Sequence, residues 1–64
     1  MDPNASLAQL RAAALEWEQA VVARDERAQL TAATQALEAA QALDSWLSSG
    51  GFLPAAWRTN RTYI

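Results

Sequence analysis

The chain has 64 residues, a net charge of −2, and neither cysteine nor histidine. A chain this short buries only about 60% of its unfolded surface, and without those residues disulfide or metal stabilisation is nearly excluded, so self-association is the expected support. The mild acidity argues against general nucleic-acid binding, which depends on a positive surface.

The first predicted element is a helix over residues 4–24. Asp2 and Pro3 are typical of an N-cap and the first helical residue, while Ser6 with Gln9 offers a capping box as an alternative start. Apolar residues then recur at alternating spacings of three and four, which indicates a seam that packs on another helix. The seam consists of Leu7, Leu10, Ala14, Trp17 and Val21.

A second apolar stripe lies beside this seam, which indicates that the helix has more than one neighbour. Arg11 and Glu18 fall between the two stripes, seven residues apart, and we interpret them as a charged pair near the edge of an interface. The stripe consists of Ala8, Ala12, Leu15 and Val22.

The apolar pattern pauses at residues 24–27, although no glycine or proline breaks the chain there. Asp25 is a good N-cap and Glu26 suits the first turn of a new helix, so we expect an αα-hairpin. The alternative is one continuous helix from about Pro3 to Ser49, roughly 70 Å long. Such a helix normally carries charged flanks, in which this chain is poor, so the hairpin is favoured.

The second predicted helix spans residues 26–49. Between Arg27 and Asp44 its only charge is Glu38, whereas a solvent-exposed helix usually carries more. We therefore expect this helix to touch several neighbours in an assembly; the alternative is that alanine is abundant merely because it is a strong helix former. One face carries Leu30, Ala33, Leu37, Ala40 and Leu47, flanked by Ala36 and Leu43.

Gly50 and Gly51 predict the end of the second helix, because glycine enters the left-handed conformation readily. We expect Gly51 to be the left-handed residue, since Phe52 could then contact Leu47, as the Schellman motif requires. If Gly50 took that position, the following residue would be another glycine, without a side chain to make the contact.

Pro54 prevents the helix from continuing, so Phe52, Leu53 and Trp57 can fold back on the helix end beside Trp46. This favours a C-terminal apolar lid, and the same residues could instead form an exposed patch that binds a partner. Residues 57–64 form a polar tail whose arginines would lie at the rim of such a patch. The predicted partner-binding residues are Trp46, Phe52, Leu53, Trp57, Arg58 and Arg61.

The stretch from Leu43 to Trp57, LDSWLSSGGFLPAAW, resembles the end of small helical proteins of unknown function from actinobacteria and their phages. Those proteins show a similar Leu-Asp-x-Trp-Leu, Gly-Gly-x-Leu-Pro, Trp series. The resemblance implies a helical hairpin and no activity. A weaker likeness joins the segment from Gly51 to Ala55, with Arg58 and Arg61, to the wing of excisionase-type DNA-binding domains, but no helix-turn-helix precedes it.

The sequence thus predicts a single all-α domain over residues 1–64 whose hairpins assemble into a four-helix or larger bundle. The predicted oligomer core consists of Leu10, Trp17, Val21, Leu30, Leu37 and Leu47.

We predict no catalytic, metal-binding or cofactor-binding residues, because the usual bases, soft ligands and covalent amines are missing, lysine included. No signal peptide or membrane span is expected, and a cytoplasmic location is the default. The predicted function is a non-enzymatic, homo-oligomeric protein that binds another protein, a host or bacterial one if this is a phage product. The alternatives are a purely self-assembling structural protein and a DNA-associated accessory protein that uses the arginine-bearing tail.

Overall fold

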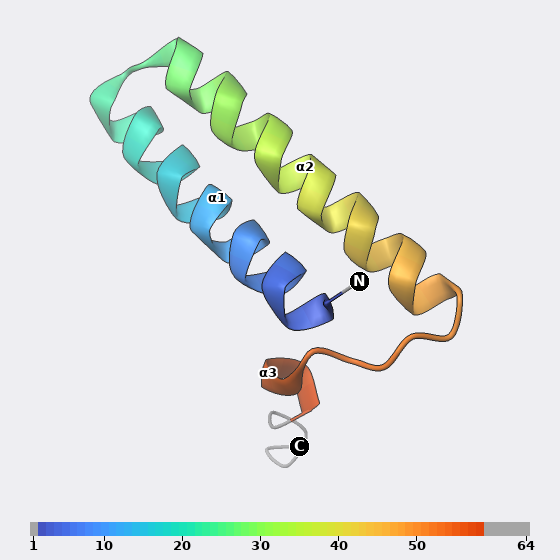
Figure 1. Cartoon of the computed structure of the whole chain (residues 1–64). Helices are drawn as coiled ribbons and strands as arrows, with labels where there is room; N and C mark the ends of the chain where they lie inside the picture. Colours follow the sequence, from blue (N-terminus) through green and yellow to red (C-terminus); the bar gives the residue numbers. More distant parts are fainter. Residues whose placement is uncertain (1, 59–64) are drawn as a thin grey trace.

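The computed structural model describes residues 2–58, which form two long helices and one short one (Figure 1). Helix α1 spans Pro3–Ala23, α2 spans Glu26–Ser48 and α3 spans Ala55–Arg58. The two long helices run side by side in opposite directions, joined by a tight turn. The predicted all-α hairpin is confirmed within one residue at each boundary, and the continuous helix is wrong.

Helix α1 begins as the Asp-Pro pair predicts. The side chain of Asp2 accepts a hydrogen bond from the backbone N–H of Asn4 at 3.0 Å, and Pro3 occupies the first turn, where its missing N–H costs nothing. Because the helix is already formed at Ser6, the alternative start at a Ser6–Gln9 capping box is wrong.

The turn between the helices is set by one left-handed residue and one cap. Arg24 has φ 58° and ψ 37°, which ends α1 without a glycine at a cost of about 1–2 kcal/mol. Asp25 then caps α2, because its side chain accepts a hydrogen bond from the backbone N–H of Ala28 at 3.1 Å. Glu26 lies in the first turn, where a negative charge is favourable.

The contact between α1 and α2 is made largely by alanine. Ala13 and Ala20 on α1 are buried, as are Ala32 and Ala39 on α2, and each pair is seven residues apart, so its members share one side of their helix. Such small side chains let two helix backbones approach closely. The larger side chains buried in this core are Leu7 and Leu43, near the open end of the hairpin.

The end of α2 corrects one prediction: the left-handed residue is Gly50, with φ 93°, and not Gly51. Both Schellman hydrogen bonds are present, from the Gly50 N–H to the Leu47 carbonyl at 3.2 Å and from the Gly51 N–H to the Trp46 carbonyl at 2.9 Å. The apolar contact that we expected from Leu47 comes from Trp46, whose ring packs edge-to-face on Phe52 with centroids 5.4 Å apart.

Gly51 is nevertheless constrained, for a different physical reason. The Trp46 indole lies so close above Gly51 that a Cβ atom there would collide with the ring. The indole Nε1–H also donates a hydrogen bond to the backbone carbonyl of Phe52 at 2.9 Å. The Trp46 side chain therefore holds the chain leaving α2 in a tight reversal.

The reversed segment ends against the start of α1. Asn4 Oδ1 accepts a hydrogen bond from the backbone N–H of Ala55 at 2.7 Å, which joins residues 51 positions apart. Pro3 and Pro54 are both buried in this region. The C-terminal segment thus folds back over the open end of the hairpin and places α3 beside it (Figure 1).

Candidate interaction surfaces

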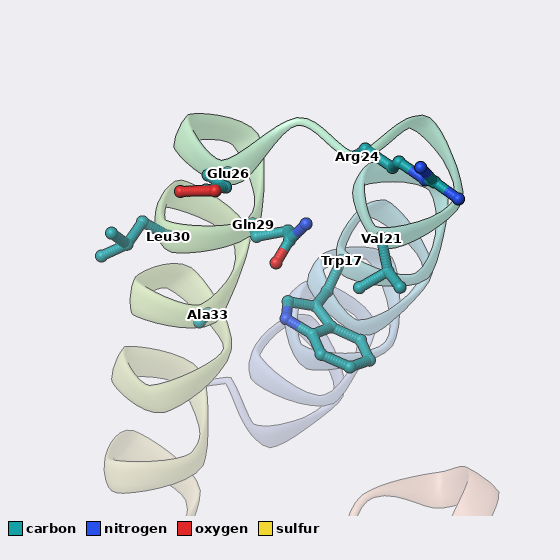
Figure 2. Close-up of a pocket in the computed structure, with 7 residues that line it drawn as sticks. All are labelled: Trp17, Val21, Arg24, Glu26, Gln29, Leu30 and Ala33. Atoms are coloured by element: carbon teal, nitrogen blue, oxygen red, sulfur yellow. The ribbon is translucent and has the colours of Figure 1, made fainter.

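A shallow groove runs between α1 and α2 near the turn, with a volume of about 580 Å³. Figure 2 shows the Trp17 indole and Val21 on the α1 side of this groove and Leu30 and Ala33 on the α2 side. A neighbouring hollow continues it along the hairpin, and we call the two together the groove face. The groove face is lined by Ala14, Trp17, Glu18, Val21, Arg24, Glu26, Gln29, Leu30, Ala33, Ala36 and Leu37.

The groove face gathers large apolar side chains that the hairpin leaves uncovered. Leu30 is 69% exposed and Leu37 is 63% exposed, and on α1 the side chains of Trp17 and Val21 are 44% and 40% exposed. These four belong to the predicted oligomer core, and the structure brings them onto one side of the hairpin. The other two members, Leu10 and Leu47, are half-buried within the chain.

The groove face carries large side chains at its rim and small ones between them. Between the protruding Trp17 and Leu37, the hollow is lined by Ala14, Ala33 and Ala36, whose side chains are single methyl groups. Large side chains at the rim and small ones between them are the arrangement by which apolar layers interdigitate. The face can therefore receive a surface with similar alternation of large and small residues.

Two charged residues of the groove face lie at its turn end on opposite flanks, and the third, Glu18, lies farther along α1. Arg24 comes from the end of α1 and Glu26 from the start of α2, and both are exposed. Figure 2 shows their side chains on opposite sides of the groove. A surface that covers the groove would meet a cation on one flank and an anion on the other.

The second predicted stripe forms a separate surface on α1, which we call the outer stripe. Leu15 is 55% exposed and Val22 is 85% exposed, and both line a hollow with Glu18, Gln19 and Ala23. Glu18 lines both this hollow and the groove face, as its predicted position between the stripes requires.

Four of the six predicted partner-binding residues lie in the C-terminal lid, which we define as residues 51–58; they are Phe52, Leu53, Trp57 and Arg58. Phe52 is 56% exposed and Leu53 is 39% exposed, whereas Trp57 and Trp46 are half-buried. Trp46 lies on α2 and contacts the lid at Gly51 and Phe52. The exposed Arg58 ends α3. Arg61 lies outside the described residues.

The described residues form apolar and charged surfaces of the kind that bind other molecules. Within residues 2–58, no group of three or more acidic side chains could hold a metal ion. No buried side-chain polar atom in that range is without a hydrogen-bond partner. The helices of the same range include none that is long and apolar enough to cross a membrane.

No family model, curated protein or solved structure matches the chain in the comparisons with known proteins. The resemblance to actinobacterial and phage proteins therefore stays a prediction.

Sequence reasoning did not find two features that shape these surfaces. Asn4 fixes the lid on α1, and a single asparagine in a first helical turn gives no signal of a partner 51 residues away. The alanine contact of the hairpin could have been found from the heptad spacing of Ala13 with Ala20 and of Ala32 with Ala39. Had it been recognised, it would have shown that Leu30 and Leu37 of α2 lie outside the contact with α1.

Proposed function

We propose that this protein is a small non-enzymatic oligomeric protein that binds another protein. One observation carries the proposal: the described chain exposes more large apolar side chains than it buries, and it gathers them on distinct surfaces. The large buried aliphatic side chains are Leu7 and Leu43. Contiguous exposed apolar surface of this kind is typical of a binding site. The exposed ones are Leu15, Trp17, Val21, Val22, Leu30, Leu37, Phe52 and Leu53.

The groove face suits self-association best, because it extends the small core of the hairpin. The exposed fractions of Trp17, Val21, Leu30 and Leu37 together equal about two whole side chains. Their burial is worth about 3–6 kcal/mol per copy, or about 6–12 kcal/mol in a dimer. Association costs about 4–15 kcal/mol in lost freedom, so this face alone supports a dimer of moderate affinity, strengthened by the alanine contacts around it.

The C-terminal lid suits a different protein, because it lies at the open end of the hairpin and displays an aromatic side chain. Phe52 is held in place from behind by Trp46, so it is exposed without being free to turn inward. Aromatic side chains, phenylalanine included, are enriched at the cores of protein interfaces. The resemblance to actinobacterial and phage proteins favours a host or bacterial protein as the partner, and the expected place of binding is the cytoplasm.

The experiment is an affinity capture from a lysate of the source cells, with two double variants compared. The test variant carries Phe52→Ala and Leu53→Ala, which keeps the backbone carbonyl that Trp46 binds. The matched control carries Leu15→Ala and Val22→Ala on the outer stripe. We expect one specific protein to be captured by the wild type and the control and lost with the test variant, while circular dichroism shows all three folded.

Three outcomes would contradict the proposal or a part of it. Retention of the captured protein by the folded test variant would exclude the lid as the binding site. If the wild type captures no protein, the purely self-assembling alternative is correct, and binding of lysate DNA in place of protein would support the DNA-associated alternative.

A further inference from the structure

The groove face is self-complementary in both charge and shape, and this restricts which molecule can bind it. At the turn end, the cation Arg24 lies on the α1 flank and the anion Glu26 lies on the α2 flank. Farther along, Trp17 of α1 and Ala33 of α2 both line each of the two hollows of the groove face, so a large side chain lies level with a small one. In the same hollow, Leu37 of α2 lies beside Ala14 of α1.

We propose that the occupant of the groove face is the groove face of a second copy of this chain, related by a two-fold axis parallel to the helices. In this arrangement both turns lie at the same end of a four-helix bundle, and α1 of each copy packs on α2 of the other. The inference rests on the self-association part of the proposed function and deepens it by fixing the direction of the second copy.

A two-fold axis parallel to the helices keeps every residue at its own level and exchanges the two flanks. It therefore places Trp17 of one copy over Ala33 of the other, and Ala14 over Leu37, so that large side chains meet small ones. At the turn end it places Arg24 of one copy beside Glu26 of the other. Each of these contacts occurs twice, because an isologous interface repeats every contact by symmetry.

The other two-fold arrangement has its axis perpendicular to the helices, and it pairs different charges. There α1 packs on α1 of the second copy in the opposite direction, and the two turns lie at opposite ends. Arg24 and Glu26 of different copies are then far apart. The residues that could meet are Arg11 and Glu18, which lie seven residues apart on the exposed edge of α1.

Charge reversal distinguishes the two arrangements. The association constant is measured by sedimentation for Arg24→Glu, Glu26→Arg and the double variant, and the same set is made at Arg11 and Glu18. We expect each single reversal at 24 or 26 to weaken association by about tenfold, since each dimer contains two such contacts, and the double variant to return close to the wild type. High salt should shrink these differences.

The double variant also separates association from folding. Glu26→Arg removes a favourable charge from the first turn of α2, and Arg24→Glu changes the residue that ends α1. Both effects persist in the double variant, so they cannot produce its recovery.

A second pair of variants tests the shape complementarity of the groove face. Ala33→Trp fills the hollow and should give a folded monomer, because the Trp17 indole of the second copy no longer has room there. The matched control is Gln35→Trp, which places the same side chain at an exposed position about 200° around the same helix. This control should still dimerise.

The results of these experiments distinguish the proposed direction of the second copy from the opposite direction and from a monomer. A double variant at 24 and 26 that associates as poorly as the single ones overturns the inference, and recovery only in the Arg11 and Glu18 set establishes the opposite direction. Normal dimerisation of Ala33→Trp also overturns it. A wild type that is monomeric contradicts both this inference and the self-association part of the proposed function, whereas the other failures leave that part intact.

Discussion

Replacing Gly51 with alanine should displace the Trp46 indole and loosen the C-terminal lid. A Cβ atom at this position would overlap the indole ring, which cannot withdraw without giving up its contacts with Phe52. The ring would lose the hydrogen bond from Nε1–H to the Phe52 carbonyl, 2.9 Å in the wild type, and the edge-to-face contact of the two rings.

The expected loss follows from these two contacts. The hydrogen bond contributes about 0.5–1.5 kcal/mol and the aromatic pair a similar amount. Alanine returns about 0.4–1 kcal/mol by restricting the unfolded chain, so the free energy of unfolding should fall by about 1–2 kcal/mol. The matched control is Gly50→Ala, which has no atom near its added Cβ but must hold alanine at φ 93°, at a cost of about 1–2 kcal/mol.

The two variants should therefore be destabilised to a similar degree for different reasons, and the Trp46 indole N–H resonance separates them. We expect Gly51→Ala to shift this resonance and speed its hydrogen exchange, whereas Gly50→Ala leaves it nearly unchanged. If the resonance keeps its wild-type position and protection in Gly51→Ala, the indole does not lie over residue 51 and the description of the lid is wrong.

Three further predictions concern the turn, the lid and the groove face. Asp25→Ala should lower the free energy of unfolding by about 1 kcal/mol because the α2 cap is lost, and this is measured as a lower urea midpoint at unchanged slope. The control is Glu38→Ala, an exposed substitution in the middle of the same helix. Equal urea midpoints for the two variants would contradict the cap. Asn4→Ala should speed hydrogen exchange at the Ala55 amide about fivefold, because its 2.7 Å acceptor is lost; unchanged exchange would show that the contact does not hold the lid. Trp17→Ala should destabilise the associated protein by about 3–5 kcal/mol and remove the concentration dependence of its melting temperature; an unaltered dependence would place Trp17 outside the interface.

The helices and their starts could be predicted from local chemistry, because Asp2, Pro3 and Asp25 act through neighbouring backbone groups. The end of α2 was predicted one residue late, because the choice of Gly51 relied on Leu47 as the contact for Phe52. In the structure Trp46 makes that contact, and Gly50 is the left-handed residue.

The large apolar residues of the groove face were predicted to be interface residues, but the reason for their exposure was not predicted. The spacing of Trp17, Val21, Leu30 and Leu37 showed that they belong to apolar faces, whereas the sequence did not show which faces meet within one chain. The hairpin closes on the alanines, since small side chains allow the closest approach, and this leaves the larger residues outward. The hydrogen bond between Asn4 and Ala55 depends on the whole path of the chain and leaves no local signal.

Whether the exposed groove face is an interface is tested most directly by the molar mass of the wild-type protein in solution, measured by sedimentation equilibrium. We expect a mass of twice 6.9 kDa at micromolar concentrations, falling toward one copy on dilution. A fully folded species of 6.9 kDa that melts cooperatively and independently of concentration would contradict it.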